Sequence, residues 1–227
     1  MRAPQIVAMG GGGFLDDDPA LDDFVLGLAG AELPAVCFLP TASGDADSAI
    51  VRFHAAFPPE RARASHVKLF ARDERDLRGH LLAHDVIYVG GGNTVNMLAI
   101  WRAHGVDEIL REAWQAGVVL AGMSAGSLCW FEGGVTDSYG PLAALPDGLG
   151  FLKGSNCPHY DGEPGRRPTY TRLVGDGTLP AGVAADDHCA LHYAAETLVD
   201  VVASRHGAGA YRVEPSGETP VAARVLG

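Results

Sequence analysis

The stretch at residues 118–127, Val-Val-Leu-Ala-Gly-Met-Ser-Ala-Gly-Ser, most restricts how this chain can fold. Its four leading apolar residues are typical of a strand buried on both faces of a parallel sheet. Gly122 and Gly126 then flank Ser124 in a Gly-x-Ser-x-Gly pattern, and glycine permits a strand-to-helix turn too tight for a residue with a Cβ atom. The pattern predicts a sharp turn that lifts the Ser124 hydroxyl out of the sheet. An ordinary glycine-rich turn with an incidental serine is the alternative.

Apolar and amphipathic segments alternate along the first half of the chain. Such alternation requires right-handed crossovers and predicts a mostly parallel sheet with helices on both faces. A β-rich region from residue 182 onward predicts a mixed or antiparallel extension of that sheet. With no internal repeat and no clear linker, the chain is expected to form a single α/β domain, residues 1–227. We expect strands at 5–9, 35–39, 67–70, 85–89 and 118–121, helices at 20–28, 43–56, 77–83, 94–103 and 106–116, a loop at 133–140 and a further helix near Arg166.

Three glycine-rich turns follow expected strands, at residues 10–13, 90–93 and 122–124. Because the carboxyl ends of parallel strands share one edge of a sheet, these turns should border a single crevice. Their backbone N–H groups would be free to face a ligand there. The first turn leads into a group of aspartates that we interpret as a solvated helix start, with metal binding as the less favoured alternative. These aspartates are Asp16, Asp17, Asp18, Asp22 and Asp23.

Composition narrows the class of protein. The formal net charge is −11, which argues against nucleic acid or an anionic membrane as the main partner. The chain has no apolar run long enough to span a membrane and does not start like a secretory signal, so a cytoplasmic protein is expected. Four cysteines form no C-x-x-C pair, which gives no sign of a zinc or redox motif, and Cys37 is interpreted as part of the core. Nothing in the sequence requires a metal or an organic cofactor, and the oligomeric state stays open.

Ser124 needs a base before it can act as a nucleophile. Nine histidines are available, and His159 is the strongest candidate because it follows a strand expected to end near Ser124 and because Pro158 stiffens its backbone. The other histidines are interpreted as surface, inter-helix or late-strand residues, with His80 and His84 among those expected on helix or loop surfaces.

A third group should orient the imidazole and stabilise its cation. Asp137, which lies between Ser124 and His159 in the sequence, is the first choice, and Asp187 is the second. An oxyanion hole needs two N–H groups aimed at one point. Ala125, the residue after the serine, is expected to supply one, and Gly92 in the neighbouring turn the other.

Three motifs in this order resemble the peptidase E family of serine peptidases, which includes aspartyl dipeptidases and, more distantly, cyanophycinases. They are Gly-Gly-Gly-Asn-Thr at 90–94, Gly-Met-Ser-Ala-Gly at 122–126 and Pro-His-Tyr at 158–160. The resemblance implies a flavodoxin-like, class I glutamine-amidotransferase-like α/β/α sandwich. It also implies Ser124 as nucleophile, His159 as base, and Gly92 and Ala125 as oxyanion donors.

The resemblance further implies a short peptide as substrate, with Asn93, Glu163 and Arg166 in contact with it. Aspartyl dipeptidases carry an arginine after Gly-Glu-x, whereas this chain has Gly165 there and Arg166 one position later, so preference for an N-terminal aspartate is an open question. The leading hypothesis is a serine exopeptidase or dipeptidase. The alternatives are an α/β-hydrolase-type esterase and a catalytically inert, amidotransferase-like module that binds ligands.

Overall fold

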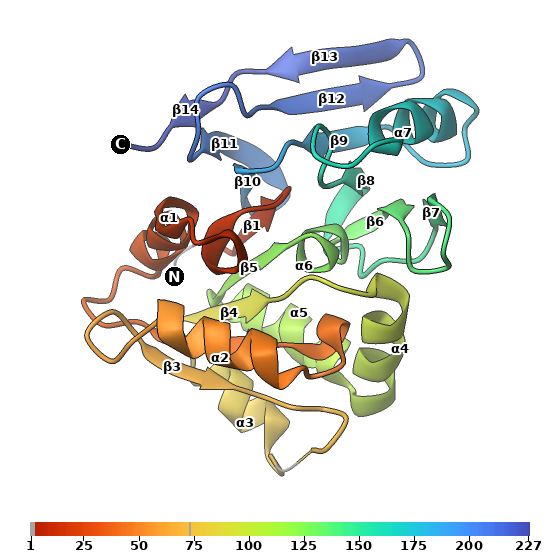
Figure 1. Cartoon of the computed structure of the whole chain (residues 1–227). Helices are drawn as coiled ribbons and strands as arrows, with labels where there is room; N and C mark the ends of the chain where they lie inside the picture. Colours follow the sequence, from red (N-terminus) through yellow and green to blue (C-terminus); the bar gives the residue numbers. More distant parts are fainter. Residues whose placement is uncertain (1–2, 73) are drawn as a thin grey trace.

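The computed structural model describes residues 3–72 and 74–227, and these residues form two β-sheets (Figure 1). The larger sheet has eight strands in the order β14-β11-β10-β1-β5-β4-β2-β3. The five strands from β1 to β3 in this order are mutually parallel, whereas β10 is antiparallel to both β1 and β11. The bounds are β1 (Gln5–Met9), β2 (Ala35–Leu39), β3 (Arg63–His66), β4 (Val86–Val89), β5 (Val119–Met123), β10 (Cys189–Ala194), β11 (Thr197–Ala203) and β14 (Arg224–Val225).

The second sheet has six strands in the order β13-β12-β9-β8-β6-β7 and mixes parallel with antiparallel pairs. The predicted α/β class is confirmed. The predicted C-terminal extension is only partly right, because β10, β11 and β14 extend the main sheet while the other late strands join the second one. The strands of the second sheet are β6 (Phe131–Thr136), β7 (Ala143–Leu145), β8 (Leu152–Cys157), β9 (Gly182–Ala185), β12 (Ala210–Glu214) and β13 (Gly217–Val221).

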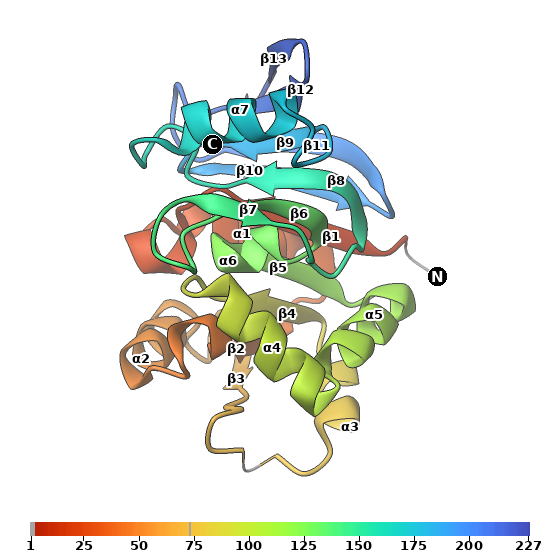
Figure 2. The ribbon, with the colours of Figure 1, turned by 90° about the vertical axis from the view of Figure 1, so that its right-hand side faces the viewer.

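Helices cover both faces of the main sheet (Figure 2). Alternate residues of β1 show the two faces: Val7 and Met9 belong to one core with the side chains of α1 and α2, while Ile6 and Ala8 belong to another with those of α3, α4 and α5. Helix α7 packs on the second sheet. Within the described residues, no helix has the length and apolar character needed to cross a bilayer. The helices are α1 (Pro19–Ala29), α2 (Asp47–Ala56), α3 (Leu77–Leu82), α4 (Thr94–His104), α5 (Val106–Ala116), α6 (Ala125–Leu128) and α7 (Arg166–Gly175), with 3₁₀ turns η1 (Gly13–Asp16) and η2 (Thr41–Ser43).

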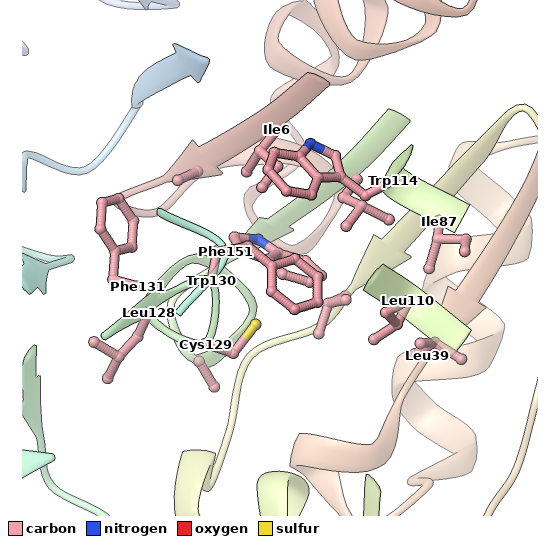
Figure 3. Close-up of a cluster of buried hydrophobic side chains, with 14 of the residues drawn as sticks. Ile6, Leu39, Ile87, Leu110, Trp114, Leu128, Cys129, Trp130, Phe131 and Phe151 are labelled. Atoms are coloured by element: carbon pink, nitrogen blue, oxygen red, sulfur yellow. The ribbon is translucent and has the colours of Figure 1, made fainter. Parts of the chain in front are cut away.

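Aromatic packing fixes the segment that follows α6 (Figure 3). The ring of Trp130 is fully buried and lies 5.8 Å, between centroids, from that of Phe151. Phe151 in turn stacks on Trp114 of α5, with the ring centroids 5.6 Å apart. The Arg111 guanidinium lies over the Phe151 ring, 4.3 Å from its centroid. Burial of large aromatic side chains is a main source of stability in protein cores. The short α6 is therefore held between a buried strand before it and a buried tryptophan after it.

The strand predicted at residues 67–70 is wrong, because β3 spans Arg63–His66 instead. The backbone N–H groups of Leu69 and Phe70 donate to Oδ2 of Asp45 at 2.5 and 2.7 Å. A carboxylate thus takes up the donors that a sheet neighbour would have accepted. The chain leaves the sheet just before these residues, although their apolar character is typical of a strand.

The loop predicted at residues 133–140 is also wrong in its first half, which belongs to β6. A Cβ atom on Gly133 would lie 2.5 Å from the Leu145 carbonyl oxygen, and one on Gly134 would lie 2.0 Å from that of Asn156. The two glycines therefore permit close approach of the neighbouring strands β7 and β8, rather than a turn.

The acidic group before α1 is not a uniformly solvated helix start. Asp18 is buried and accepts hydrogen bonds from Ser204 Oγ and from His188 Nδ1, the latter at 2.8 Å. Asp22 is fully buried, and its Oδ1 accepts a 2.8 Å hydrogen bond from the Tyr88 hydroxyl. Desolvation raises the pKa of Asp22 to about 7, so this carboxyl is largely neutral below that pH.

This buried carboxyl predicts a pH-dependent stability that an Asp22→Asn substitution removes. An unfolded chain loses the proton near its ordinary pKa of 3.8, so between pH 4 and 7 the folded state binds more protons and its stability falls as pH rises. Across that range the parent should lose roughly 2–4 kcal/mol relative to Asp22→Asn, which keeps a neutral acceptor for Tyr88. Urea unfolding of both proteins at pH 4.5 and 8 measures this difference. Equal pH dependence in the two proteins would show that Asp22 is ionised in the fold.

Candidate active site

The elbow at Ser124 is built by close backbone packing. Ser124 has φ 55° and ψ −114°, a strained conformation for a residue other than glycine, and such strain concentrates at functional sites. A Cβ atom on Gly122 would lie 2.4 Å from the Gly126 carbonyl oxygen, and one on Gly126 would lie 2.4 Å from that of Val89. The Ser124 N–H donates to the Met9 carbonyl at 3.2 Å. The two glycines therefore allow β5, α6 and β4 to approach closely while the serine itself takes the strained position.

The expected oxyanion donors flank this serine. Ala125 is the first residue of α6, so its N–H is among the helix donors that lack a partner within the helix. Gly92 lies in the turn after β4 and lines the same pocket as Ser124, and a Cβ atom on its neighbour Gly91 would lie 3.3 Å from that of Ser124. Gly92 has φ 137°, and a Cβ atom there would lie 2.2 Å from the Ala42 carbonyl oxygen. Bulk at Gly92 would thus displace the turn itself.

His159 follows the end of β8 and also has a positive φ, 54°. Its Nδ1 lies 2.6 Å from Oδ1 of Asp187, and both side chains are partly exposed. This hydrogen bond holds the pKa of the Asp187 carboxyl below its usual value. A carboxylate on Nδ1 selects the tautomer with the proton on that nitrogen, which leaves Nε2 available as a base.

The partner of His159 is therefore Asp187, the second choice in the sequence analysis, and not Asp137, the first. Asp187 lies in the turn between β9 and β10, where its N–H donates to Oδ1 of Asp161 at 2.8 Å. Asp137 instead has an oxygen 3.9 Å from the Arg166 guanidinium. The sequence favours Asp137 because it lies between Ser124 and His159. In the fold, the β9–β10 turn brings the later Asp187 to His159 instead.

Ser124 and His159 both lie near the end of β1 and the glycine turn that follows it. The Ser124 N–H bonds to Met9, the last residue of β1, and two residues later a Cβ atom on Gly11 would lie 3.1 Å from His159 Cε1 and 2.2 Å from Asp187 Oδ1. Glycine at position 11 thus leaves room for the imidazole and the carboxylate beside the elbow. The prediction that the glycine turns border one crevice agrees with these contacts.

A pocket of about 270 Å³ opens beside the elbow. It brings together six sequence-predicted residues and adds Ser138, which sequence reasoning missed. Ser138 Oγ accepts from the Thr94 N–H at 2.9 Å and also contacts Thr136 Oγ1, while its carbonyl accepts from Asn93 Nδ2 at 3.1 Å. The signal that could have found it is the Thr-Asp-Ser sequence at 136–138. The pocket residues are Gly92, Asn93, Ser124, Asp137, Ser138, Glu163 and Arg166.

Charge in this pocket is partly compensated. The Arg166 side chain is almost fully buried, donates from Nε to Glu163 Oε2 at 2.6 Å and from Nη1 to the Val135 carbonyl at 3.1 Å. Asp137 adds a second carboxylate near the same guanidinium. One buried cation therefore faces two anions, and the pocket carries a net negative charge. Buried charges are tolerated when they are paired in this way.

Comparison with known proteins shows the family of this chain. The family model for peptidase family S51 matches residues 6–201, from β1 to β11. The chain belongs to peptidase family S51. The uncharacterized peptidase YgaJ of Bacillus subtilis (strain 168) is 52% identical and aligns over 98% of this chain and 99% of its own length. The predicted resemblance to the peptidase E family is thus confirmed, and with it the assignment as a serine-type peptidase hydrolase.

Two crystal structures share the fold. A peptidase from an acI-B1 Actinobacterium matches with a TM-score of 0.72 at 19% identity, over 97% of this chain and 95% of that one. A putative peptidase E protein from Listeria monocytogenes EGD-e matches with a TM-score of 0.64 at 18% identity, over 87% of this chain and 97% of that one. At identities this low, the two matches show a shared fold alone.

The contact between His159 and Asp187 predicts unequal effects for the two candidate acids. Asp187→Asn should lower kcat for dipeptide hydrolysis by about 10²–10⁴-fold, because an amide can stabilise the wrong imidazole tautomer and cannot stabilise its cation. Asp137→Asn should act mainly on KM, because Asp137 lines the pocket beside Arg166. Steady-state kinetics of the two variants compare them directly. The reverse pattern would return the third position to Asp137.

A methyl group at Gly162 should disturb the same carboxylate. A Cβ atom there would lie 2.0 Å from Asp187 Oδ2, so Gly162→Ala must displace the Asp187 side chain. We expect kcat to fall at least tenfold with little change in melting temperature, because Gly162 is exposed. Gly27→Ala, at an exposed glycine of α1 with open space around it and no positive φ, is the control for an added methyl group. An unchanged kcat in Gly162→Ala would mean that the Asp187 position is not needed for turnover.

Proposed function

We propose that this S51 member is a serine exopeptidase, in practice a dipeptidase, with Ser124 as nucleophile, His159 as base and Asp187 as the acid that orients it. The observation that carries the proposal is the hydrogen bond from His159 to Asp187 beside a strained Ser124 elbow. The flavodoxin-like, amidotransferase-like architecture belongs to the same proposal and is supported by helices on both faces of the main sheet.

The chemistry follows the order of proton transfers. His159 Nε2 takes the proton from the Ser124 hydroxyl as its oxygen bonds to the scissile carbonyl carbon. The N–H groups of Gly92 and Ala125 stabilise the negative oxygen that forms, a contribution of about 3 kcal/mol for each such donor. His159 then gives its proton to the departing amine, and water releases the acyl group by the same steps in reverse order. Asp187 stays ionised throughout and stabilises the imidazolium.

The size and charge of the pocket suit a short peptide bound by its amino terminus. A volume of about 270 Å³ lies near the lower end of ligand sites, roughly 300 Å³. Glu163 and Asp137 offer carboxylates to an α-ammonium group. Glu163 already accepts a hydrogen bond from Arg166 Nε, so an N-terminal aspartate would have to compete with Glu163 for the guanidinium. We therefore expect neutral N-terminal residues to be accepted at least as well as aspartate.

Loss of the Ser124 hydroxyl tests the reaction class. Ser124→Ala should lower turnover of a dipeptide panel by about 10⁴-fold or more while leaving the fold intact. A fluorophosphonate should label the parent and not the variant. A parent that is inert to the label and to peptides would point to the ligand-binding alternative, and rapid cleavage of nitrophenyl esters alone would point to an esterase. Hydrolysis by Ser124→Ala at the parent's rate would exclude Ser124 as nucleophile.

Releasing Arg166 from Glu163 tests the specificity. With an Xaa-Leu panel, the parent should cleave Ala-Leu at least as well as Asp-Leu, and N-acetylation should abolish cleavage. Glu163→Gln should shift the kcat/KM ratio toward Asp-Leu by about tenfold, because removal of one carboxylate leaves Arg166 less compensated. Arg167→Gln, at the neighbouring arginine that pairs with Glu218, is the matched control. A parent with strong Asp-Leu preference would contradict the proposed charge balance.

A further inference from the structure

A thiol and two imidazoles meet beneath α3, well away from the peptidase pocket. Sγ of Cys37, on β2, and one ring nitrogen each of His80 and His84 all lie within 4.8 Å of one another. His84 precedes β4, whereas Ser124 follows β5, and these two strands are parallel neighbours. The cluster therefore lies toward the amino-terminal edge of the sheet, opposite to the crevice. It is not part of the reaction proposed above.

The surrounding hydrogen bonds select the ring nitrogens that are left for a ligand. His84 Nδ1 donates a hydrogen bond to the His80 carbonyl oxygen at 2.8 Å, so the lone pair is on Nε2, which the Ser65 hydroxyl contacts and which a cation would take over. His80 Nδ1 lies 3.4 Å from Oε2 of Glu74, a contact that likewise favours the proton on Nδ1. Metal-binding histidines in proteins show this pattern, with the second nitrogen donating to a carbonyl or carboxylate group.

One buried ring nitrogen, Nε2 of His80, indicates that this cluster can take a ligand. His80 Nε2 is buried and has no hydrogen-bond partner among the described residues. A buried acceptor without a partner costs free energy, so its presence in a packed structure calls for an explanation. Ser65, the register partner of Cys37 on β3, has its Oγ 2.7 Å from His84 Nε2 and lies on the same side of the cluster.

The three side chains offer donor atoms that zinc binds in proteins, one sulfur and two imidazole nitrogens. Neutral imidazoles and a thiolate are the ligand forms that zinc requires, and the thiol proton leaves to solvent when the metal binds.

We propose that Cys37, His80 and His84 form a binding site for Zn²⁺ or a similar borderline-soft divalent cation, with an oxygen at Ser65 completing the tetrahedron. Zn–S and Zn–N bonds of about 2.3 and 2.0–2.1 Å place ligand atoms roughly 3.5 Å apart, so the cluster must close by about 1 Å. His80 lies in the six-residue α3 and His84 lies two residues after it, at one side of the fold (Figure 1). A cation there would link β2 to α3 and stabilise the edge of the sheet.

The sequence analysis interpreted Cys37 as core and both histidines as surface residues. The spacing of four between His80 and His84 was the available signal, although His84 lies two residues after the end of α3. The third ligand lies more than forty residues earlier in the chain, and no sequence spacing connects it to them. Only the packing of α3 against the sheet brings the thiol to the histidines.

Metal titration of the full-length protein tests the proposal. After treatment with a chelator, Zn²⁺ should bind with a stoichiometry of one per chain by calorimetry, release a proton and raise the melting temperature. Co²⁺ should give a thiolate-to-metal charge-transfer band. His80→Gln should weaken Zn²⁺ binding at least tenfold, and Cys37→Ser should abolish the Co²⁺ band. Glu74→Gln should weaken binding by about tenfold through loss of the Nδ1 partner.

A second histidine pair supplies the control. His54 Nε2 lies 3.0 Å from His66 Nδ1, outside the cluster, so His54→Gln should leave Zn²⁺ binding unchanged. His80→Gln should also keep the parent's peptidase activity and circular dichroism spectrum. Because His80 is partly exposed, this variant is expected to fold even where Cys37→Ser does not. Absence of stoichiometric binding, binding unchanged in His80→Gln, or binding lost in His54→Gln would overturn the proposal.

Discussion

The close approach of Gly126 to the Val89 carbonyl oxygen is the contact on which the crevice depends. A Cβ atom at position 126 would lie 2.4 Å from that oxygen, so any side chain would force α6 away from β4. Val89 ends β4 and leads into the turn that contains Gly92, while Gly126 lies two residues after Ser124. The same backbone contact therefore sets both the elbow and the turn opposite it. This contact fixes where the Ser124 elbow lies relative to the turn that contains Gly92.

Sequence patterns predicted what local burial determines. Strands β1 and β2 match their predicted bounds because every residue of β2, and all but the first of β1, is buried, so an apolar run is the direct result of the fold. The predictions failed where a distant group decides the local structure. Asp45 takes the backbone donors of residues 69–70, and the glycines at 133–134 serve strand packing. Neither interaction is visible in a window of neighbouring residues.

The candidate site divides in the same way. The turns that carry Ser124, Gly92 and Ala125 were predictable because a glycine-rich turn has its own sequence signature. The place of His159 just after a strand was predictable as well, while the roles assigned to these four residues stay predictions. The acidic partner of His159 was not predictable, because Asp137 and Asp187 are both plausible from the sequence. Only the pairing of β10 with β1, which places the turn before β10 near His159, decides between them. Asp137 lies near Arg166 instead and contributes to the charge of the pocket.

A carboxylate lies beside Nδ1 of both His159 and His80, but the surroundings of Nε2 differ between the two histidines. At His159, Asp187 takes Nδ1 and leaves Nε2 at an edge where the elbow serine and a polar pocket lie. At His80, Glu74 lies against Nδ1 and leaves a buried Nε2 near a thiol and a second imidazole. A free imidazole lone pair can accept a proton or coordinate a cation, and its neighbours decide which. Near the Ser124 elbow the lone pair has the surroundings expected of a base, whereas beside a thiol it has those of a metal ligand.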